Sequence, residues 1–446
     1  MKGQTTKMKK LIAILVALVM IFALAACANN APAGSTPAGN SSAGSSAGAS
    51  SGASATTTPS NAAKKDIKFY GKIVEYTSGV KMTDALVAAE KDKYNIDAIQ
   101  VDWTNLEKVI RTGIASGDPC DVYCFWGGRM SEFKDMAVDL TPYLDADPAW
   151  KAQFSENDLA AETVDGKILG APWESNFSVI LVNKKLVEDL GITIPDQWTI
   201  DEFNAVAKKI KDAGVFPFAN ATDNSRGDWI YRNAILSTTV TAGTYEQYTQ
   251  GQMPYTGPET TKALNAVKSL FDNQYLYPGA GAVTAKSDEI KAAFSQGKIA
   301  MMAEIAAGAK TTASQMGFDI INAPWPNADT KPALLGGLSV MFVPKNCKDI
   351  DAAVDVVKAW TSKDVMSIHA EEGYIPVNTQ LTISDPFITG LMKQTQYVKQ
   401  QECPAYLPLT DYATNNLQAD LVLNGGVQTV EQQLEKFRQD YLASLK

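Results

Sequence analysis

The chain has 446 residues, of which 45% are hydrophobic and 20% are charged, an ordinary composition for a folded globular protein. This length exceeds what one ordinary core accommodates and suits two lobes. The net charge of −9 and the lack of a basic run in the folded part disfavour nucleic acids and other phosphate-rich partners.

The N-terminal 27 residues have the pattern of a lipoprotein signal peptide. Four lysines precede an unbroken apolar segment, 11–24, that suits a signal peptide and is short for a membrane-spanning helix. Leu24-Ala25-Ala26-Cys27 then has the order of a lipobox, in which the Cys27 thiol receives a diacylglycerol. We expect a cleaved signal peptide (1–26) and a lipid on Cys27 that anchors the protein at the extracellular face of the bacterial cell membrane.

The segment after Cys27 differs in composition from the rest of the chain. Residues 28–63 are almost entirely Ala, Ser, Gly, Thr, Pro and Asn, without charge or large apolar side chains. Such a segment cannot bury enough apolar surface to offset its ordering entropy. Residues 27–63 are therefore expected to form a flexible tether.

Beyond residue 64, short apolar runs alternate with helical patterns. Strands are expected at 67–70, 96–101, 122–125 and 179–182, and amphipathic helices follow several of them. Three helices are predicted to begin with capping boxes, at Thr104 with Glu107, Thr199 with Glu202, and Thr429 with Gln432. This alternation predicts an α/β fold with mostly parallel sheets, in which ligands bind outside the carboxyl ends of the strands.

The sequence contains little that supports catalysis or metal binding. His369 is the only histidine, lies within an expected helix, and is interpreted as a surface or packing residue. Neither a nucleophile elbow nor a Walker A or zinc-protease motif is present. Of the cysteines, Cys120 and Cys124 are close enough for a disulfide, which the sequence leaves open, but plain buried thiols are favoured. We therefore expect no enzymatic activity, no cofactor and no metal.

Several tryptophans stand where strands end or loops begin. Trp126 precedes two glycines, Trp173 and Trp325 adjoin prolines, and Trp229 follows a polar loop that ends at Asp228. An indole face packs against the C–H groups of a sugar ring, while neighbouring polar side chains bind its hydroxyls. These four residues favour a stacking site, although any single Trp could equally belong to a core.

Six short segments, in order, resemble the family-1 extracellular solute-binding proteins, the sugar-binding components of ABC importers. They are Ser116-Gly117-Asp118-Pro119-Cys120-Asp121-Val122, Asp139 to Leu144 (DLTPYL), Asp165 to Trp173 (DGKILGAPW), Val182-Asn183-Lys184 with Trp198-Thr199, Phe294 to Met301 (FSQGKIAM), and Gly373 to Val377 (GYIPV). One departure concerns the segment 303–307, which reads AEIAA where the family often places a ligand-stacking Trp.

The resemblance implies the two-lobed periplasmic-binding-protein fold, type II-like, with hinge strands between the lobes and the ligand cleft between them. The first lobe is expected to comprise 64–175 and 322–380, and the second 176–321 and 381–446. The ligand-binding residues are expected to be Tyr76, Trp126, Trp173, Glu174, Asn176, Asp228, Trp229, Trp325 and Tyr374. The implied partners are a carbohydrate and the permease subunits of the importer, and the protein is expected to be a monomer that does not bind nucleic acid.

Two other functions stay open from the sequence. A protein of the same fold could bind a non-sugar solute such as a peptide or a polyamine, for which Glu75, Glu174 and Asp228 could supply carboxylates. A secreted lipoprotein glycoside hydrolase would need only two suitably placed carboxylates among the 49 acidic residues. The particular sugar and the particular permease are not specified by the sequence.

Overall fold

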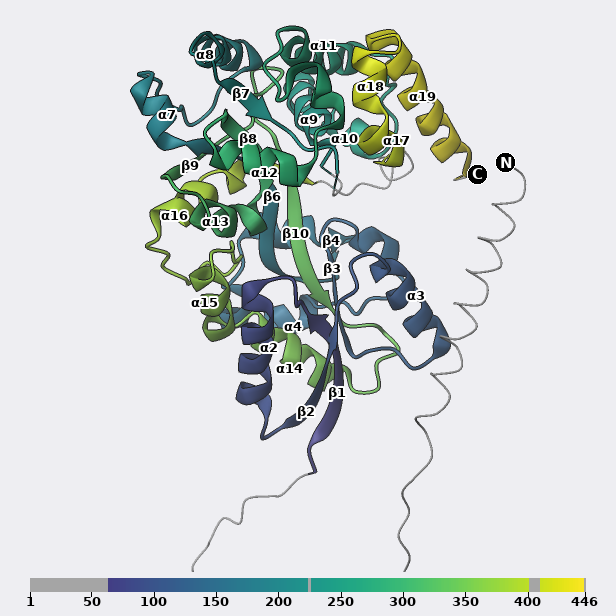
Figure 1. Ribbon diagram of the computed structural model, residues 1–446. Coiled ribbons are helices and arrows are strands. Elements are labelled where there is room, and N and C mark those ends of the chain that lie inside the picture. Colours follow the sequence, from purple (N-terminus) through teal and green to yellow (C-terminus); the bar gives the residue numbers. More distant parts are fainter. Residues whose placement is uncertain (1–62, 224–225, 401–409, 445–446) are drawn as a thin grey trace, which may run out of the picture. The chain divides into compact units, whose positions relative to one another are not determined.

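The computed structural model describes residues 63–223, 226–400 and 410–444, all within one compact unit (Figure 1). The expected signal peptide, the expected lipid attachment site at Cys27 and the segment 28–62 lie outside the described residues. In the part that is described, every helix is too short or too polar to cross a membrane.

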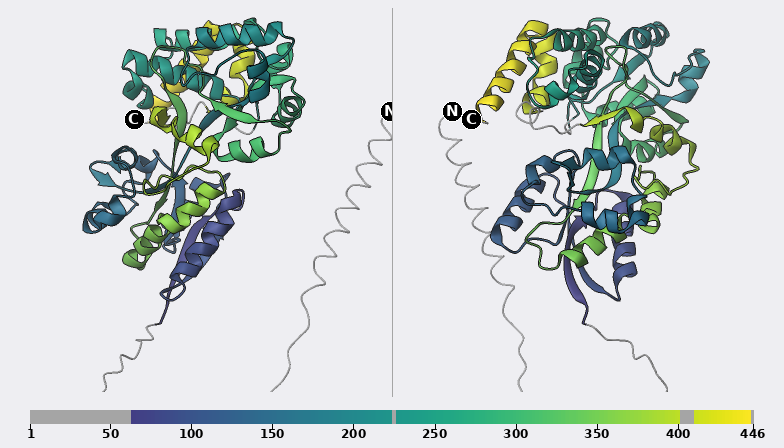
Figure 2. Two further views of the ribbon diagram at one scale, coloured as in Figure 1. Left: turned by 90° about the vertical axis from the view of Figure 1, so that its left-hand side faces the viewer. Right: turned by 180° about the vertical axis from the view of Figure 1, so that it is seen from behind.

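Two hydrophobic cores define two lobes. The first core is built from buried residues between 67 and 173 and between 340 and 377, and the second from residues between 177 and 335 and between 375 and 434. Both views in Figure 2 keep the purple and blue elements of the first lobe apart from the teal elements of the second. The chain therefore forms the expected two-lobed α/β fold.

The first lobe is a sheet covered by helices. Strand β1 pairs in parallel with β2 and β3, and β3 pairs antiparallel with β10. Its main elements are β1 (Lys65–Lys72), α2 (Thr77–Glu90), β2 (Tyr94–Gln100), α3 (Leu106–Ser116), β3 (Val122–Trp126), η1 (Met130–Phe133), α4 (Thr141–Ala146), α5 (Pro148–Lys151), α6 (Glu156–Ala161), β4 (Thr163–Val164), β5 (Lys167–Ile168), α14 (Ile350–Trp360) and α15 (Lys363–Glu371).

The second lobe is richer in helices. Strand β8 pairs in parallel with β7 and antiparallel with β6, which also pairs with β9. Its elements are α7 (Lys184–Asp189), α8 (Ile200–Asp212), β7 (Phe216–Ala219), α9 (Trp229–Ala242), α10 (Tyr245–Thr249), α11 (Pro258–Asp272), η2 (Gly279–Thr284), α12 (Ser287–Ser295), β8 (Ile299–Ile305), α13 (Ala306–Ser314), β9 (Ile320–Ala323), α16 (Pro386–Met392), η3 (Thr395–Tyr397), β11 (Val398–Gln400), α17 (Thr410–Asn415), α18 (Leu417–Val422) and α19 (Val427–Ser444).

Two long strands, β6 (Ala171–Asn183) and β10 (Leu334–Phe342), connect the lobes. The first half of β6 pairs with β10 and its second half pairs with β8 and β9, so one continuous sheet runs through both lobes. Figure 1 shows both strands between the two groups of elements. All but one residue of β6 is buried, which matches its apolar sequence and its position between two cores.

The chain returns to the first lobe later than the expected boundary at 321/322. Residues between Ala323 and Leu335 belong to the second core, and the passage occurs within β10 before Val340. At this passage the two strands lie very close together, because a Cβ atom at Gly336 would collide with Phe177 and lie 2.7 Å from the carbonyl oxygen of Asn176. Parallel pairs occur within each lobe, whereas the connecting strands pair mainly antiparallel, so the sheet is mixed.

Candidate functional site

A cavity of about 680 Å³ lies between the two lobes. It is open to solvent and large enough for a small oligosaccharide or another solute of similar size. The first lobe and the connecting strands contribute Glu75, Tyr76, Thr77, Trp103, Trp126, Gly127, Asn176, Gly337, Leu338, Ser339 and Tyr374. The second lobe contributes Arg226, Lys291, Glu304, Ile305, Ala307, Gly308, Thr311, Thr312 and Gln315.

Two indole rings form an apolar wall on the first-lobe side. Trp126 is the last residue of β3, and Trp103 lies in the turn between β2 and α3. Their rings stack with centroids 6.1 Å apart and planes 27° apart, and both side chains stay partly exposed. Asp102 fixes the Trp103 turn, because its backbone N–H donates to the Tyr70 hydroxyl at 2.8 Å. Paired indoles at the carboxyl end of a strand suit stacking against an apolar ring face.

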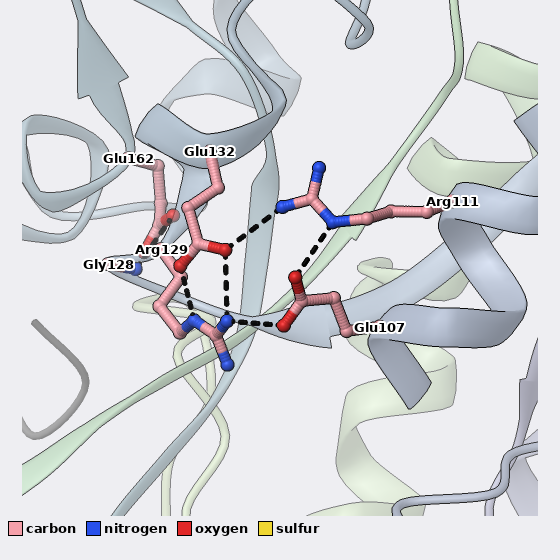
Figure 3. A network of polar contacts seen from close by, with 6 residues as sticks. All are labelled: Glu107, Arg111, Gly128, Arg129, Glu132 and Glu162. Atoms are coloured by element: carbon pink, nitrogen blue, oxygen red, sulfur yellow. Dashed lines mark hydrogen bonds and ion pairs between the residues drawn. The ribbon is translucent and has the colours of Figure 1, made fainter. Parts of the chain in front are cut away.

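A polar network lies beside Trp126 in the first lobe, and Figure 3 shows its two arginines and two of its glutamates. Arg129 and Arg111 each pair with both Glu107 and Glu132, at distances of 2.6–3.1 Å. The Arg129 side chain is only 5% exposed, and its guanidinium carbon lies 5.3 Å from the Trp126 ring centroid. This closed set of ion pairs holds the cation against the indole, so the Trp126 ring rests on a fixed support.

The two positions after Trp126 require glycine for different structural reasons. A Cβ atom at Gly127 would collide with Glu162 and lie 2.7 Å from the carbonyl oxygen of Leu338 on β10. Gly128 has a φ of +77°, which favours glycine, and its N–H donates to Glu162 at 3.3 Å. Burial raises the pKa of Glu162 to about 8, and the Gly128 hydrogen bond only partly opposes this effect.

Two tyrosines form a second aromatic group in the cavity. Tyr76 precedes α2 and Tyr374 follows α15, and their rings stack with centroids 4.7 Å apart. The Thr77 backbone N–H donates to the Tyr374 hydroxyl at 3.0 Å. Glu174 on β6 lies behind this pair, 1% exposed, and accepts hydrogen bonds from Tyr76 at 3.4 Å and Ser339 at 3.0 Å. The buried carboxylate thus orients two residues that line the cavity.

The second-lobe wall carries charged and small polar groups. Glu304, at the end of β8, is 1% exposed and pairs with Arg226 at 2.6 Å and Lys291 at 3.3 Å. It also accepts a hydrogen bond from Thr312 at 3.0 Å. No aromatic side chain from this lobe is among the described residues that line the cavity. The described second-lobe wall therefore lacks the aromatic faces of the first lobe and carries the two cations of the lining.

Four of the nine sequence-predicted binding residues line the cavity, namely Tyr76, Trp126, Asn176 and Tyr374. Asn176 extends from β6, where its side-chain oxygen accepts a hydrogen bond from the Ala307 N–H at 3.1 Å. The structure brings these four together from sequence positions up to 298 residues apart, because the ends of first-lobe elements meet the connecting strand β6 there.

The other five lie outside the cavity wall, and for them a direct ligand contact is not supported. Trp173 is 1% exposed in the first core, packed edge-on against Trp360, and Trp325 is 3% exposed in the second core against Phe218. Glu174 lies one layer behind the wall, as described above. Asp228 and Trp229 are buried at the start of α9, where Asp228 pairs with Arg232 at 3.4 Å. Their neighbour Arg226 reaches the cavity instead.

Sequence reasoning missed Trp103, Arg226, Lys291 and Glu304 as cavity residues. Trp103 follows a predicted strand, which is the same signal that identified Trp126. Glu304 stands in the segment where the family often has a Trp, and this departure was visible in the sequence. Lys291 carried no such signal, since it reaches the cavity from one face of α12.

The remaining candidate groups in the described residues are buried or half-buried. His369 is 0% exposed, with Nδ1 2.9 Å from the Ser78 hydroxyl and Nε2 3.6 Å from Glu174. Because Ser78 is also 0% exposed, this arrangement is closed to a substrate. Cys120, Cys124 and Cys347 are free thiols, and burial raises the pKa of each. Among the described residues no group of three His, Cys, Asp or Glu side chains is placed to hold a metal.

Two α/β lobes, two connecting strands and a cavity between them define a solute-binding protein. The family model for bacterial extracellular solute-binding proteins matches residues 75–367, and the chain belongs to this family. The multiple sugar-binding protein of Streptococcus mutans serotype c is 24% identical over 187 residues, which are 41% of this chain and 44% of that protein. The match thus spans less than half the length of this relative.

Solved structures share the fold at low sequence identity. The binding protein MsmE from Bacillus subtilis subsp. subtilis, in an open conformation, superposes with a TM-score of 0.73 at 17% identity, over 86% of this chain and 98% of that one. The sugar-binding protein MalE from Xanthomonas citri superposes with a TM-score of 0.70 at 15% identity, over 85% and 99%.

Proposed function

We propose that this protein captures a sugar or oligosaccharide in the cavity between its lobes and delivers it to the membrane subunits of an ABC importer. The observation that carries the proposal is the composition of the cavity wall. Two stacked indoles and two stacked phenols face a wall of hydroxyl, amide and charged groups across about 680 Å³. Flat apolar faces opposite hydrogen-bonding groups complement the two kinds of surface on a pyranose ring.

The family and the relatives support a sugar as the solute. The matching curated relative is described as a multiple sugar-binding protein, and one of the superposed structures as a sugar-binding protein. Closure of the two lobes by bending of β6 and β10 would enclose the solute and create the surface that the importer recognises.

The alternatives have weaker support from the cavity. A polyamine would need several free carboxylates, yet Glu174 and Asp228 are buried outside the cavity wall and Glu304 is paired with two cations, which leaves Glu75 as the one unpaired carboxylate in the described lining. A glycoside hydrolase would need two carboxylates free for acid–base or nucleophilic work. Of the two that line the cavity, Glu75 and Glu304, only Glu75 lacks an ion pair among the described residues.

A thermal-shift screen followed by calorimetry tests the proposal. A sugar at a concentration of one hundred times its Kd should stabilise the protein by about 2.7 kcal/mol. The recovered sugar should be chemically unchanged after long incubation, whereas cleavage would favour the hydrolase. A screen in which peptides or polyamines stabilise the protein and sugars do not would contradict the proposal.

We further propose that Cys27 carries a lipid that anchors the protein, because a lipobox follows the apolar segment directly. Replacing Cys27 with Ser should move the protein from the membrane fraction to the soluble fraction, which cell fractionation and immunoblotting would show. Retention of the variant in the membrane at the wild-type level would contradict lipidation at this site.

A further inference from the structure

The second-lobe wall of the cavity concentrates positive charge around one buried carboxylate. Arg226 lies in the loop before α9, Lys291 lies on α12, and Glu304 is the penultimate residue of β8, so three separate segments converge on this point. The Arg226 side chain is 15% exposed, that of Lys291 is 37% exposed, and that of Glu304 is 1% exposed. Both cations line the cavity.

Glu304 is fully occupied by protein donors. One oxygen receives Arg226 at 2.6 Å and the Ile305 N–H at 3.0 Å, and the other receives Lys291 at 3.3 Å and Thr312 at 3.0 Å. A guanidinium has five N–H donors and an ammonium three, and the carboxylate engages only some of them. Two cations against one carboxylate leave this cluster with a formal charge of +1.

Charge is distributed unevenly across the cavity. Glu75 is the only formally charged side chain that the first lobe contributes to the described lining, whereas the second lobe carries the net positive cluster. Ala307 and Gly308, in the first turn of α13, line the cavity beside this cluster. A neutral sugar would satisfy hydrogen bonds on this wall and leave its excess charge uncompensated.

We propose that the solute is an anionic glycan, a sugar with a carboxylate or sulfate group. Its ring stacks on the aromatic side chains of the first lobe, and its anionic group binds Arg226 and Lys291 beside Glu304. Ion-paired hydrogen bonds to a carboxylate or a sulfate are about twice as strong as neutral ones, and both cations are already held in place by Glu304. This inference rests on the proposed function and specifies the class of sugar.

The test is calorimetry with matched pairs of sugars that differ in charge. The carboxylate pairs are trigalacturonic acid with its neutral methyl ester, and glucuronosyl-xylotriose with its neutral methyl ester. The sulfate pair is lactose sulfate with lactose. At least one anionic member should bind about tenfold or more tightly than its neutral counterpart, and the arm in which this occurs identifies the anionic group.

Lys291→Met tests whether the preference comes from this wall. Methionine keeps the length of the side chain, and Arg226 and Thr312 still hold Glu304. The ratio of Kd values between neutral and anionic members should fall at least about fivefold, with little change for the neutral member. Lys298→Met is the matched control, since Lys298 is exposed, follows α12 and does not line the cavity. Melting temperatures of both variants report on their folding.

The outcomes separate this inference from the proposed function. If neutral members bind as tightly as anionic ones, or if Lys291→Met and Lys298→Met have equal effects, the anionic preference is refuted and sugar binding stands. If no sugar in any pair binds, both the inference and the proposed function fail.

Discussion

Trp126 and Trp103 contribute the largest apolar faces in the cavity, and Trp126 rests on the ion-paired Arg129. Buried aromatic anchors are typical hot spots, so Trp126→Ala should weaken sugar binding by roughly 2–4 kcal/mol, about thirtyfold to almost a thousandfold in Kd. Calorimetry measures the affinity, and the melting temperature is recorded in parallel. Trp325→Phe, a change in the core of the second lobe, is the control that should leave the affinity unchanged.

An unchanged affinity in Trp126→Ala, or a loss that only follows global unfolding, would contradict the stacking role. The same measurement on Trp103→Ala shows whether the second indole contacts the solute or only supports the first.

Glu162 should make the stability of the protein depend on pH. Its pKa is raised from 4.5 to about 8 in the folded chain because it is buried, whereas in the unfolded chain it ionises near 4.5. Its contribution to stability is therefore greatest below pH 4.5 and is lost as the pH rises toward 8. As the pH rises from 6 to 8, the free energy of unfolding of Glu162→Gln should therefore increase relative to that of the wild type by on the order of 2 kcal/mol. Urea unfolding at several pH values measures this difference, and parallel pH profiles would contradict it.

The distinction between cavity and core tryptophans could be predicted only in part. A strand end followed by glycines correctly placed Trp126 at the cavity. Proline neighbours were interpreted as loop signals for Trp173 and Trp325, yet Trp173 lies within the buried strand β6 and Trp325 packs in a core. Which side of a strand faces solvent depends on the partner strands, and these are distant in the sequence.

At the scale of elements, the helix N-termini show which local sequence signals are sufficient to predict where a helix begins. Thr199 and Glu202 form the predicted capping box at α8. The box predicted at Thr104 is wrong, because α3 begins at Leu106 and the Asp102 carboxylate instead accepts the N–H groups of Thr104 and Asn105. Thr429 lies inside α19, which begins at Val427. The four expected strands coincide with β1, β2, β3 and the second half of β6, because a short apolar run is a local signal, whereas the competition between neighbouring caps depends on tertiary contacts.

Of the two neighbouring glycines in β10, Gly337 should tolerate an added methyl group, whereas Gly336 should not. A Cβ at Gly336 would collide with Phe177 on β6, whereas one at Gly337 meets nothing within 4 Å. Gly336→Ala should therefore lower the free energy of unfolding by about 1–3 kcal/mol, and Gly337→Ala should change it by about 0.5 kcal/mol or less. Urea unfolding of the two variants measures both, and equal midpoints would show that the strands can separate without cost.

At the scale of the whole molecule, the fold places the two lobes on either side of the cavity described above and joins them through a continuous sheet. The two-lobed fold was predictable from the order of six short segments and from the alternation of strands and helices. The passage within β10 was not predictable, because the apolar residues of the segment 323–335, such as Trp325 and Leu334, would fit either core. The charged second-lobe wall could not be predicted either, since Arg226, Lys291 and Glu304 come from segments that are distant in the sequence.

The most direct test of sugar capture in this cavity is calorimetric titration of the protein and of the double variant Trp103→Ala, Trp126→Ala with an oligosaccharide that the thermal-shift screen selects. We predict one binding site in the wild-type protein, and in the double variant a loss of affinity of about a hundredfold or more at a melting temperature close to that of the wild type. Equal affinity in the two proteins, or no binding of any oligosaccharide to the wild type, would contradict sugar capture in this cavity.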